Sequence, residues 1–129
     1  MLTILAIDDS RTIREMLRET LRNAGFDVHV AVDGLDGLEK LHEVAPDVII
    51  TDINMPRMDG FEVATQVRDN GRLQHLPIIM ITSRTGEKHR ERALEIGVND
   101  YMGKPFQENQ LLDKIQSLLD EKVHLTYHG

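Results

Sequence analysis

The stretch D-V-I-I-T-D-I-N-M-P, residues 47–56, decides the fold of this chain. Its apolar run, Val48 to Ile50, has no polar alternation, which is typical of a strand buried on both faces. The run ends at a single carboxylate, Asp52, and Pro56 indicates that a loop follows. We therefore expect Asp52 at the C-terminal end of a buried strand, where open parallel sheets bind their ligands.

Similar apolar runs that end in polar residues occur elsewhere in the chain. Leu2–Ile7 precedes Asp8 and Asp9, and Leu76–Ile81 precedes Thr82 and Ser83. Shorter strands are predicted at Phe26–Val32, an edge strand because of its polar residues, and at Val98–Met102. Helices are predicted between Ser10 and Gly25, between Gly34 and Pro46, and at Phe61–Asn70, Glu87–Ile96 and Gln107–Lys122.

The alternation of five strands with five helices predicts one α/β domain. The connections are too long for hairpins, so the strands should be parallel, with helices on both faces of the sheet in a doubly wound arrangement. We expect this domain over residues 1–121. A frayed C-terminal tail, residues 122–129, would follow and would contain His124 and His128.

Composition limits the classes of function. The net charge of −7 argues against sequence-independent binding of nucleic acid, because that role needs an excess of Lys and Arg. The absence of cysteine excludes disulfides, thiol catalysis and thiolate zinc sites. The N-terminus lacks a basic leader, and no apolar run approaches the ~20 residues of a membrane span. We expect a soluble cytoplasmic monomer.

The polar strand ends should converge along one edge of the sheet. They are Asp8 with Asp9, Asp52, Thr82 and Lys104. Three carboxylates in one pocket repel one another unless a cation neutralises them, which favours a hard divalent ion such as Mg²⁺ or Mn²⁺. A lysine and a hydroxyl do not help to bind a metal ion, but both suit a phosphoryl group.

These residues carry a resemblance to a known family. Asp8-Asp9, the motif D-I-N-M-P-x-M-D-G at 52–60, Thr82, and Tyr101 with Lys104-Pro105-Phe106 resemble the receiver domain of two-component response regulators. The resemblance covers residues 2 to about 121. In size and layout the chain is similar to the single-domain chemotaxis regulators. It implies a flavodoxin-like sheet with the strand order 2-1-3-4-5.

The resemblance implies a role for each carboxylate. Asp52 would be the phosphoacceptor, and a sensor histidine kinase would donate the phosphoryl group. Asp9, Asp52 and the backbone carbonyl of Asn54 would coordinate Mg²⁺, and Asp8 would act through a water molecule. The chain would then be a stoichiometric acceptor that assists its own phosphorylation and dephosphorylation, not an enzyme.

The resemblance also implies a switch and an output surface. Lys104 would draw charge from the phosphoryl oxygens, Thr82 would turn its hydroxyl toward them, and Tyr101 would move inward. The changed surface would be the helix at 87–96, the strand at 98–102 and the helix at 107–122. It would bind a downstream protein, for which a flagellar motor switch is one candidate. The Lys104-Pro105 peptide bond would be cis.

Three positions after the strand ends bear on the detail. Arg84, next to Ser83, stands where the familiar chemotaxis regulator carries Glu, so both residues are expected to modulate hydrolysis of the phosphorylated form. Gly103 replaces an apolar residue before Lys104 and should loosen that loop. The stretch S-R-T-G-E-K-H-R also resembles receivers of hybrid chemotaxis kinases, although the initiating Met and short ends suggest a free-standing domain.

Three other functions remain open. A flavodoxin would share the layout, but Asp8 and Asp9 would repel the flavin phosphate. A phosphatase with an aspartyl nucleophile could use a D-x-D pair, but here the second member is Asn54 and the chain is short for a substrate-selecting cap. The domain could also serve as a phosphate sink for a kinase that signals mainly elsewhere.

Overall fold

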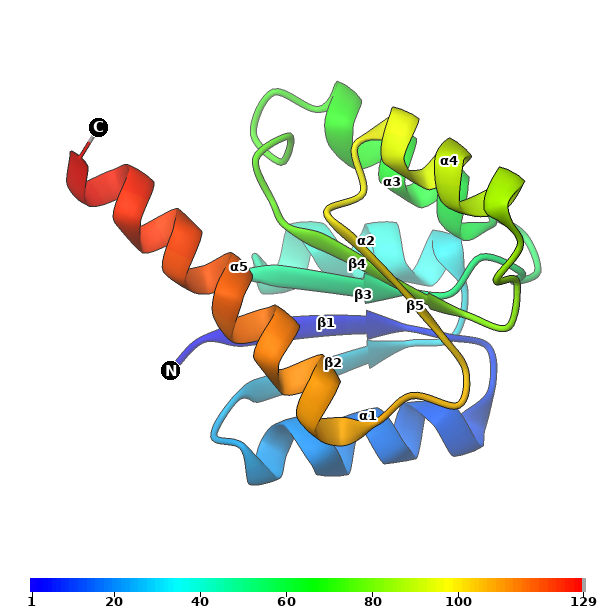
Figure 1. The fold of residues 1–129 in the computed structure, drawn as a ribbon. Coiled ribbons are helices and arrows are strands. Elements are labelled where there is room, and N and C mark those ends of the chain that lie inside the picture. The colour runs from blue at the N-terminus through cyan, green and yellow to red at the C-terminus, as the bar shows by residue number, and fades with distance from the viewer. Residues whose placement is uncertain (129) are drawn as a thin grey trace.

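The computed structural model describes the backbone of residues 1–128 and the side chains of residues 1–120. Strands and helices alternate along the chain (Figure 1). The elements are β1 (Thr3–Ile7), α1 (Arg11–Asn23), β2 (Asp27–Ala31), α2 (Gly34–Val44), β3 (Val48–Thr51), α3 (Gly60–Asp69), β4 (Ile78–Thr82), α4 (Glu87–Ile96), β5 (Asp100–Gly103) and α5 (Glu108–His128).

The five strands form one parallel sheet in the order β2-β1-β3-β4-β5. This confirms the predicted doubly wound, flavodoxin-like topology, and β2 lies at an edge as its polar residues indicated. Ile7 of β1 pairs with Thr51 of β3. The residues that follow these two strands, Asp8 and Asp52, therefore leave the sheet at the same level.

Residue parity along the strands separates two hydrophobic cores. In β1, Leu5 and Ile7 belong to one core, whereas Ile4 and Ala6 belong to the other. Helices α2, α3 and α4 cover the first core, and α1 and α5 cover the second, so the sheet lies between two helical layers (Figure 1). The three central strands are buried on both faces, as their apolar runs predicted.

Two strands, β4 and β5, each begin two residues later than predicted. Pro77 has no N–H to donate to the ladder, and β4 begins after it, although the Pro77 carbonyl still accepts a hydrogen bond from Ile49 N at 2.9 Å. Before β5, the N–H of Val98 donates to Ala93 in the last turn of α4, so Val98 closes that helix instead of starting the strand.

The predicted end of the last helix is wrong. The backbone of α5 is helical through His128, so the helix includes most of the segment expected to be a frayed tail. No proline or glycine interrupts the sequence between Pro105 and Gly129, and nothing in it forces the helix to stop at Lys122. The side chains of His124 and His128 lie outside the described residues. Among the helices described, none combines the length and the apolar character that crossing a membrane requires.

Candidate functional site

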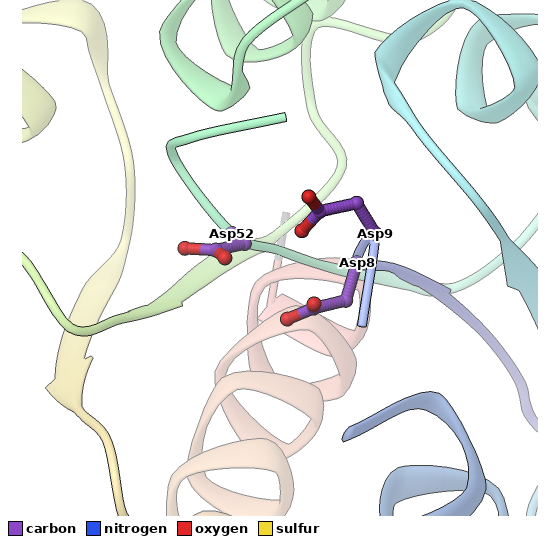
Figure 2. A group of neighbouring side chains, drawn as sticks. All are labelled: Asp8, Asp9 and Asp52. Carbon is purple, nitrogen blue, oxygen red and sulfur yellow. The ribbon is translucent and has the colours of Figure 1, made fainter. Parts of the chain in front are cut away.

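The site lies at the C-terminal edge of the sheet, where three carboxylates meet. Asp8 and Asp9 follow β1, and Asp52 follows β3 (Figure 2). The backbone N–H of Asp52 donates to Ile7 O at 3.0 Å, which extends the ladder between the two strands by one bond. One carboxylate oxygen from each of the three residues lies within 4.8 Å of the others. Asp8 and Asp52 are buried, whereas Asp9 is exposed.

Lys104 joins two of these carboxylates. Its Nζ donates to Asp8 Oδ2 at 2.7 Å and to Asp52 Oδ2 at 2.9 Å. The lysine follows β5, and its backbone N–H donates to Thr82 O at 2.9 Å. The peptide bond to Pro105 is cis, the geometry that the family resemblance implied. The side chain therefore reaches from the last strand across the sheet to the end of the first.

The pKa values of Asp8 and Lys104 are both raised, for different reasons. Burial raises the pKa of the Asp8 carboxyl, and the hydrogen bond from Lys104 offsets only part of that rise. Burial by itself would lower the pKa of Lys104, but its hydrogen bonds to Asp8 and Asp52 outweigh this effect and raise the pKa. Lys104 therefore carries a positive charge beside Asp8 and Asp52.

The loop after β3 is packed tightly against Asp52. The backbone N–H of Ile53 donates to Asp52 Oδ1 at 2.7 Å, and Gly60 N donates to Ile53 O at 2.8 Å. A Cβ added at Gly60 would collide with the carbonyl oxygen of Asp52. Asp59 caps α3 by accepting from Glu62 N at 2.9 Å. The motif at 52–60 therefore folds as one compact turn around the phosphoacceptor candidate.

The residues after β4 connect this loop to β5. Thr82 is fully buried, and its Oγ1 accepts from Arg84 N at 3.1 Å. The Asn54 amide faces the Arg84 guanidinium, and with its oxygen turned toward Arg84 it accepts from Nε at 2.7 Å and from Nη2 at 3.3 Å. The Tyr101 hydroxyl donates to the Arg84 carbonyl. Arg84 thus contacts three of the residues predicted to act in the site, while Ser83 is exposed.

Tyr101 is half-buried, with the aromatic ring beside α4 and the hydroxyl held by Arg84. Burial raises the pKa of its hydroxyl, and the charge of Asp52 raises it further. The inward movement predicted for Tyr101 would break the contact between its hydroxyl and Arg84.

Comparison with known proteins identifies the family. Residues 4–116 match the family described as the response regulator receiver domain. The chain belongs to this family. The receiver domain is 42% identical over 116 residues to the response regulator MprA of Mycobacterium leprae, an alignment that covers 90% of this chain and 50% of MprA. The chain spans about half the length of the curated relatives it matches.

Solved receiver structures resemble this one closely. The chemotaxis protein CheY4 of Vibrio cholerae has a TM-score of 0.86 and 38% sequence identity, with 92% of this chain and 98% of that chain covered. A response regulator from Chloroflexus aurantiacus has a TM-score of 0.88 and 34% identity, with the same coverage. Both likenesses extend over nearly the whole receiver domain.

The residues of the site fit a divalent metal ion. The three carboxylates offer oxygen ligands, which Mg²⁺ and Mn²⁺ prefer, and their mutual distances allow all three to approach one ion directly or through water. The backbone carbonyl of Asn54 belongs to the loop that starts at Asp52. The geometry therefore brings together Asp8, Asp9 and Asp52, and Lys104 contacts two of them.

One ion pair next to the site was not predicted. Arg57, in the loop after β3, donates to Asp33, which lies before α2. The two residues are far apart in the sequence, and neither follows a buried apolar run directly. The only available signal was the Asp33-Gly34 pair that starts a helix, and it indicates a cap rather than a partner for Arg57.

Proposed function

We propose that this receiver domain accepts one phosphoryl group on Asp52 from a phosphohistidine of a sensor histidine kinase. The observation that carries the proposal is a buried carboxylate with a lysine ammonium 2.9 Å away and two further carboxylates within reach of one metal ion. A lysine paired with a single carboxylate would be an ordinary ion pair. The additional carboxylates give the site the excess negative charge that a divalent cation would balance.

The transfer exchanges one bond to phosphorus for another. A carboxylate oxygen of Asp52 attacks phosphorus as the bond between phosphorus and the imidazole nitrogen breaks, and the electron pair stays on that nitrogen. The product is an acyl phosphate on Asp52 and a neutral histidine on the kinase. A bound Mg²⁺ would supply positive charge to the phosphoryl oxygens and would be held by Asp9, Asp52 and the Asn54 carbonyl, with Asp8 acting through water.

Lys104 and Thr82 would respond to the new group. Lys104 carries the positive charge nearest to Asp52 and would transfer its hydrogen bond from the carboxylate to a phosphoryl oxygen. Thr82 would break its contact with Arg84 N to donate its hydroxyl to the same group. Tyr101 would then lose its anchor and move inward, which changes the surface formed by α4, β5 and α5.

We infer that this surface binds a downstream protein. The coverage of 98% of the chemotaxis protein CheY4 supports a chemotaxis-type regulator, with the flagellar motor switch as one candidate target. A phosphate sink, or the receiver of a hybrid kinase, would use the same chemistry with a different output. Because the donor kinase makes its phosphohistidine from ATP, we place the reaction in the cytoplasm, with the receiver acting as a monomer and without binding nucleic acid.

The experiment is phosphorylation with acetyl phosphate and with a histidine kinase, with and without Mg²⁺ or Mn²⁺. The intact mass of the wild type should rise by one phosphate only with the metal, and the mass of the Asp52→Asn variant should not change. Phosphate found on a serine or histidine would contradict the proposal. Proteins captured by the phosphorylated and unphosphorylated forms would then separate an effector regulator from a phosphate sink.

A further inference from the structure

The loop that carries Asn54 contains a strained turn. The backbone N–H of Met58 donates to Pro56 O at 2.8 Å, two residues earlier, and Arg57 between them has a φ of 68°. A turn of this kind with a positive φ at its centre is rare and strained in a residue that has a side chain. Such a turn persists only where its surroundings hold it, and glycine would be the ordinary choice at this position.

The side chain of Arg57 supplies that hold. Its Nε donates to Asp33 Oδ2 at 2.7 Å and its Nη2 donates to Asp33 Oδ1 at 3.0 Å, so both carboxylate oxygens are engaged. Asp33 is fixed in turn because its Oδ1 also accepts from Asp36 N at 2.9 Å and caps α2. The Asp33 side chain is only 7% exposed and that of Arg57 is 56% exposed, so this bidentate pair is buried on the aspartate side and open to water on the arginine side.

The start of α2 also lies directly against this loop. A Cβ added at Gly34 would collide with the backbone and Cβ of Met58. The first residues of α2 therefore support the loop from one side, and the pair between Arg57 and Asp33 joins the two segments. Along the chain, Asn54 lies between Asp52 and Arg57.

We propose that Arg57 and Asp33 are positioning residues that hold the loop so that the Asn54 carbonyl points at the metal. This inference rests on the metal site of the proposed function. The pair that would support this site, Arg57 and Asp33, lies outside the acidic cluster. The pair acts through backbone position alone. Its loss should weaken Mg²⁺ binding without removing any ligand atom.

The opposite charges of Arg57 and Asp33 make it possible to distinguish a tether from a purely electrostatic effect. If they acted only by their electric field, removing the cation Arg57 would strengthen Mg²⁺ binding, and removing the anion Asp33 would weaken it. If they act as a tether, either removal weakens binding. The effect of Arg57→Gln therefore has opposite signs under the two explanations.

The experiment measures the Kd of the full chain for Mg²⁺ by calorimetry, together with the metal-free melting temperature. We expect Arg57→Gln and Asp33→Asn each to weaken binding by about tenfold, the lower end of the effect of losing a residue that supports a metal ligand. Asparagine keeps an oxygen that caps α2. The double variant should bind no more weakly than either single variant, because all three lack the same contact.

Two further variants complete the set. Arg57→Gly removes the side chain but suits the positive φ, so it tests the tether even if glutamine at this position impairs folding. Arg72→Gln is the matched control, because it removes one positive charge from the exposed loop before β4, and its Kd should equal that of the wild type. At saturating Mg²⁺, the rate of phosphorylation by acetyl phosphate should return to near the wild-type rate in the Arg57 and Asp33 variants.

Tighter or unchanged Mg²⁺ binding by folded Arg57→Gln and Arg57→Gly would overturn the tether. Additive losses in the double variant would show that the two residues act separately and would overturn it as well. A wild type that does not bind Mg²⁺ would instead contradict the proposed function, and the tether would fall with it.

Discussion

Replacing Lys104 by methionine should destabilise the metal-free protein. The substitution keeps the length of the apolar stem but leaves Asp8 and Asp52 without the cation that they share. Removing one partner of a fully buried ion pair costs about 3–5 kcal/mol. Here the lysine side chain is 16% exposed and the two carboxylates are 3% and 10% exposed, so water screens part of the repulsion. We therefore expect a loss of about 2–3 kcal/mol in the free energy of unfolding.

This loss converts to a change in melting temperature. An unfolding entropy of about 2.1 cal/mol/K per residue gives roughly 0.27 kcal/mol/K for a chain of 129 residues. The Lys104→Met variant should therefore melt about 7–11 °C below the wild type in the presence of a chelator. Mg²⁺ should recover much of this difference, because the ion replaces the missing positive charge.

The assay is thermal unfolding followed by circular dichroism, with Lys114→Met as the matched control. Lys114 pairs with Asp100 of β5, the strand that Lys104 follows. Both side chains are about one-third exposed, at 35% for Lys114 and 32% for Asp100. Its loss should cost less than about 1 kcal/mol. Equal melting temperatures for the two variants without metal would show that burial of the carboxylates does not set the stability of the site.

Three further predictions concern the metal, the acyl phosphate and acid stability. Mg²⁺ at about 100 times its Kd should raise the wild-type melting temperature by about 10 °C. The Asp9→Ala variant should not show this rise. A wild-type melting temperature that does not change with Mg²⁺ would refute the metal site. The phosphorylated form of Arg84→Glu should decay several-fold faster than that of the wild type, because a carboxylate at this position can accept a proton from the attacking water. The decay of both proteins is measured at one Mg²⁺ concentration without phosphatase. Slower decay in the variant would show that Arg84 assists the attacking water. The hydrogen bond from Arg57 holds the pKa of Asp33 below its ordinary value of 3.8, so ionised Asp33 stabilises the fold above that pH and the contribution is lost as the pH falls through the lower folded pKa. The melting temperature of Asp33→Asn should lack this part of the acid dependence, which a pH series of melting curves would measure.

The fold could be predicted from the sequence because the central strands carry their own signal. An uninterrupted apolar run such as Val48 to Ile50 predicts burial on both faces, and the structure confirms this burial. Polar residues directly after such runs have to leave the sheet at its C-terminal edge, so the meeting of Asp8, Asp52 and Lys104 followed from topology. The strand order needed the family resemblance, because alternation alone permits several orders.

Element ends were less predictable because hydrogen bonds beyond the local pattern determine them. Val98 is apolar and suits a strand, but the last turn of α4 takes its N–H. The continuation of α5 to His128 was missed because the short segment after the predicted end at Lys122 was interpreted as a frayed C-terminal tail.

The contacts near the site that were not predicted from the sequence involve long side chains from separate loops. Arg57 reaches Asp33, and Arg84 reaches Asn54, through flexible side chains whose direction leaves no periodic trace in the sequence. The expectation that Arg84 modulates hydrolysis of the phosphorylated form remains a prediction. Its contact with Asn54 shows that the guanidinium already has a partner in the loop after Asp52.

The alternation of β3 between the two cores limits how this chain can change in length during evolution. Val48 and Ile50 face one core and Ile49 faces the other, and Asp52 follows immediately. Inserting or deleting one residue in this strand would exchange the two faces and turn Asp52, the proposed phosphoacceptor, to the wrong side of the sheet. The exposed loop around Gly71, where added atoms meet nothing within 4 Å, has no such constraint. Insertions and deletions among homologous chains should therefore gather at that end of the sheet, opposite the site.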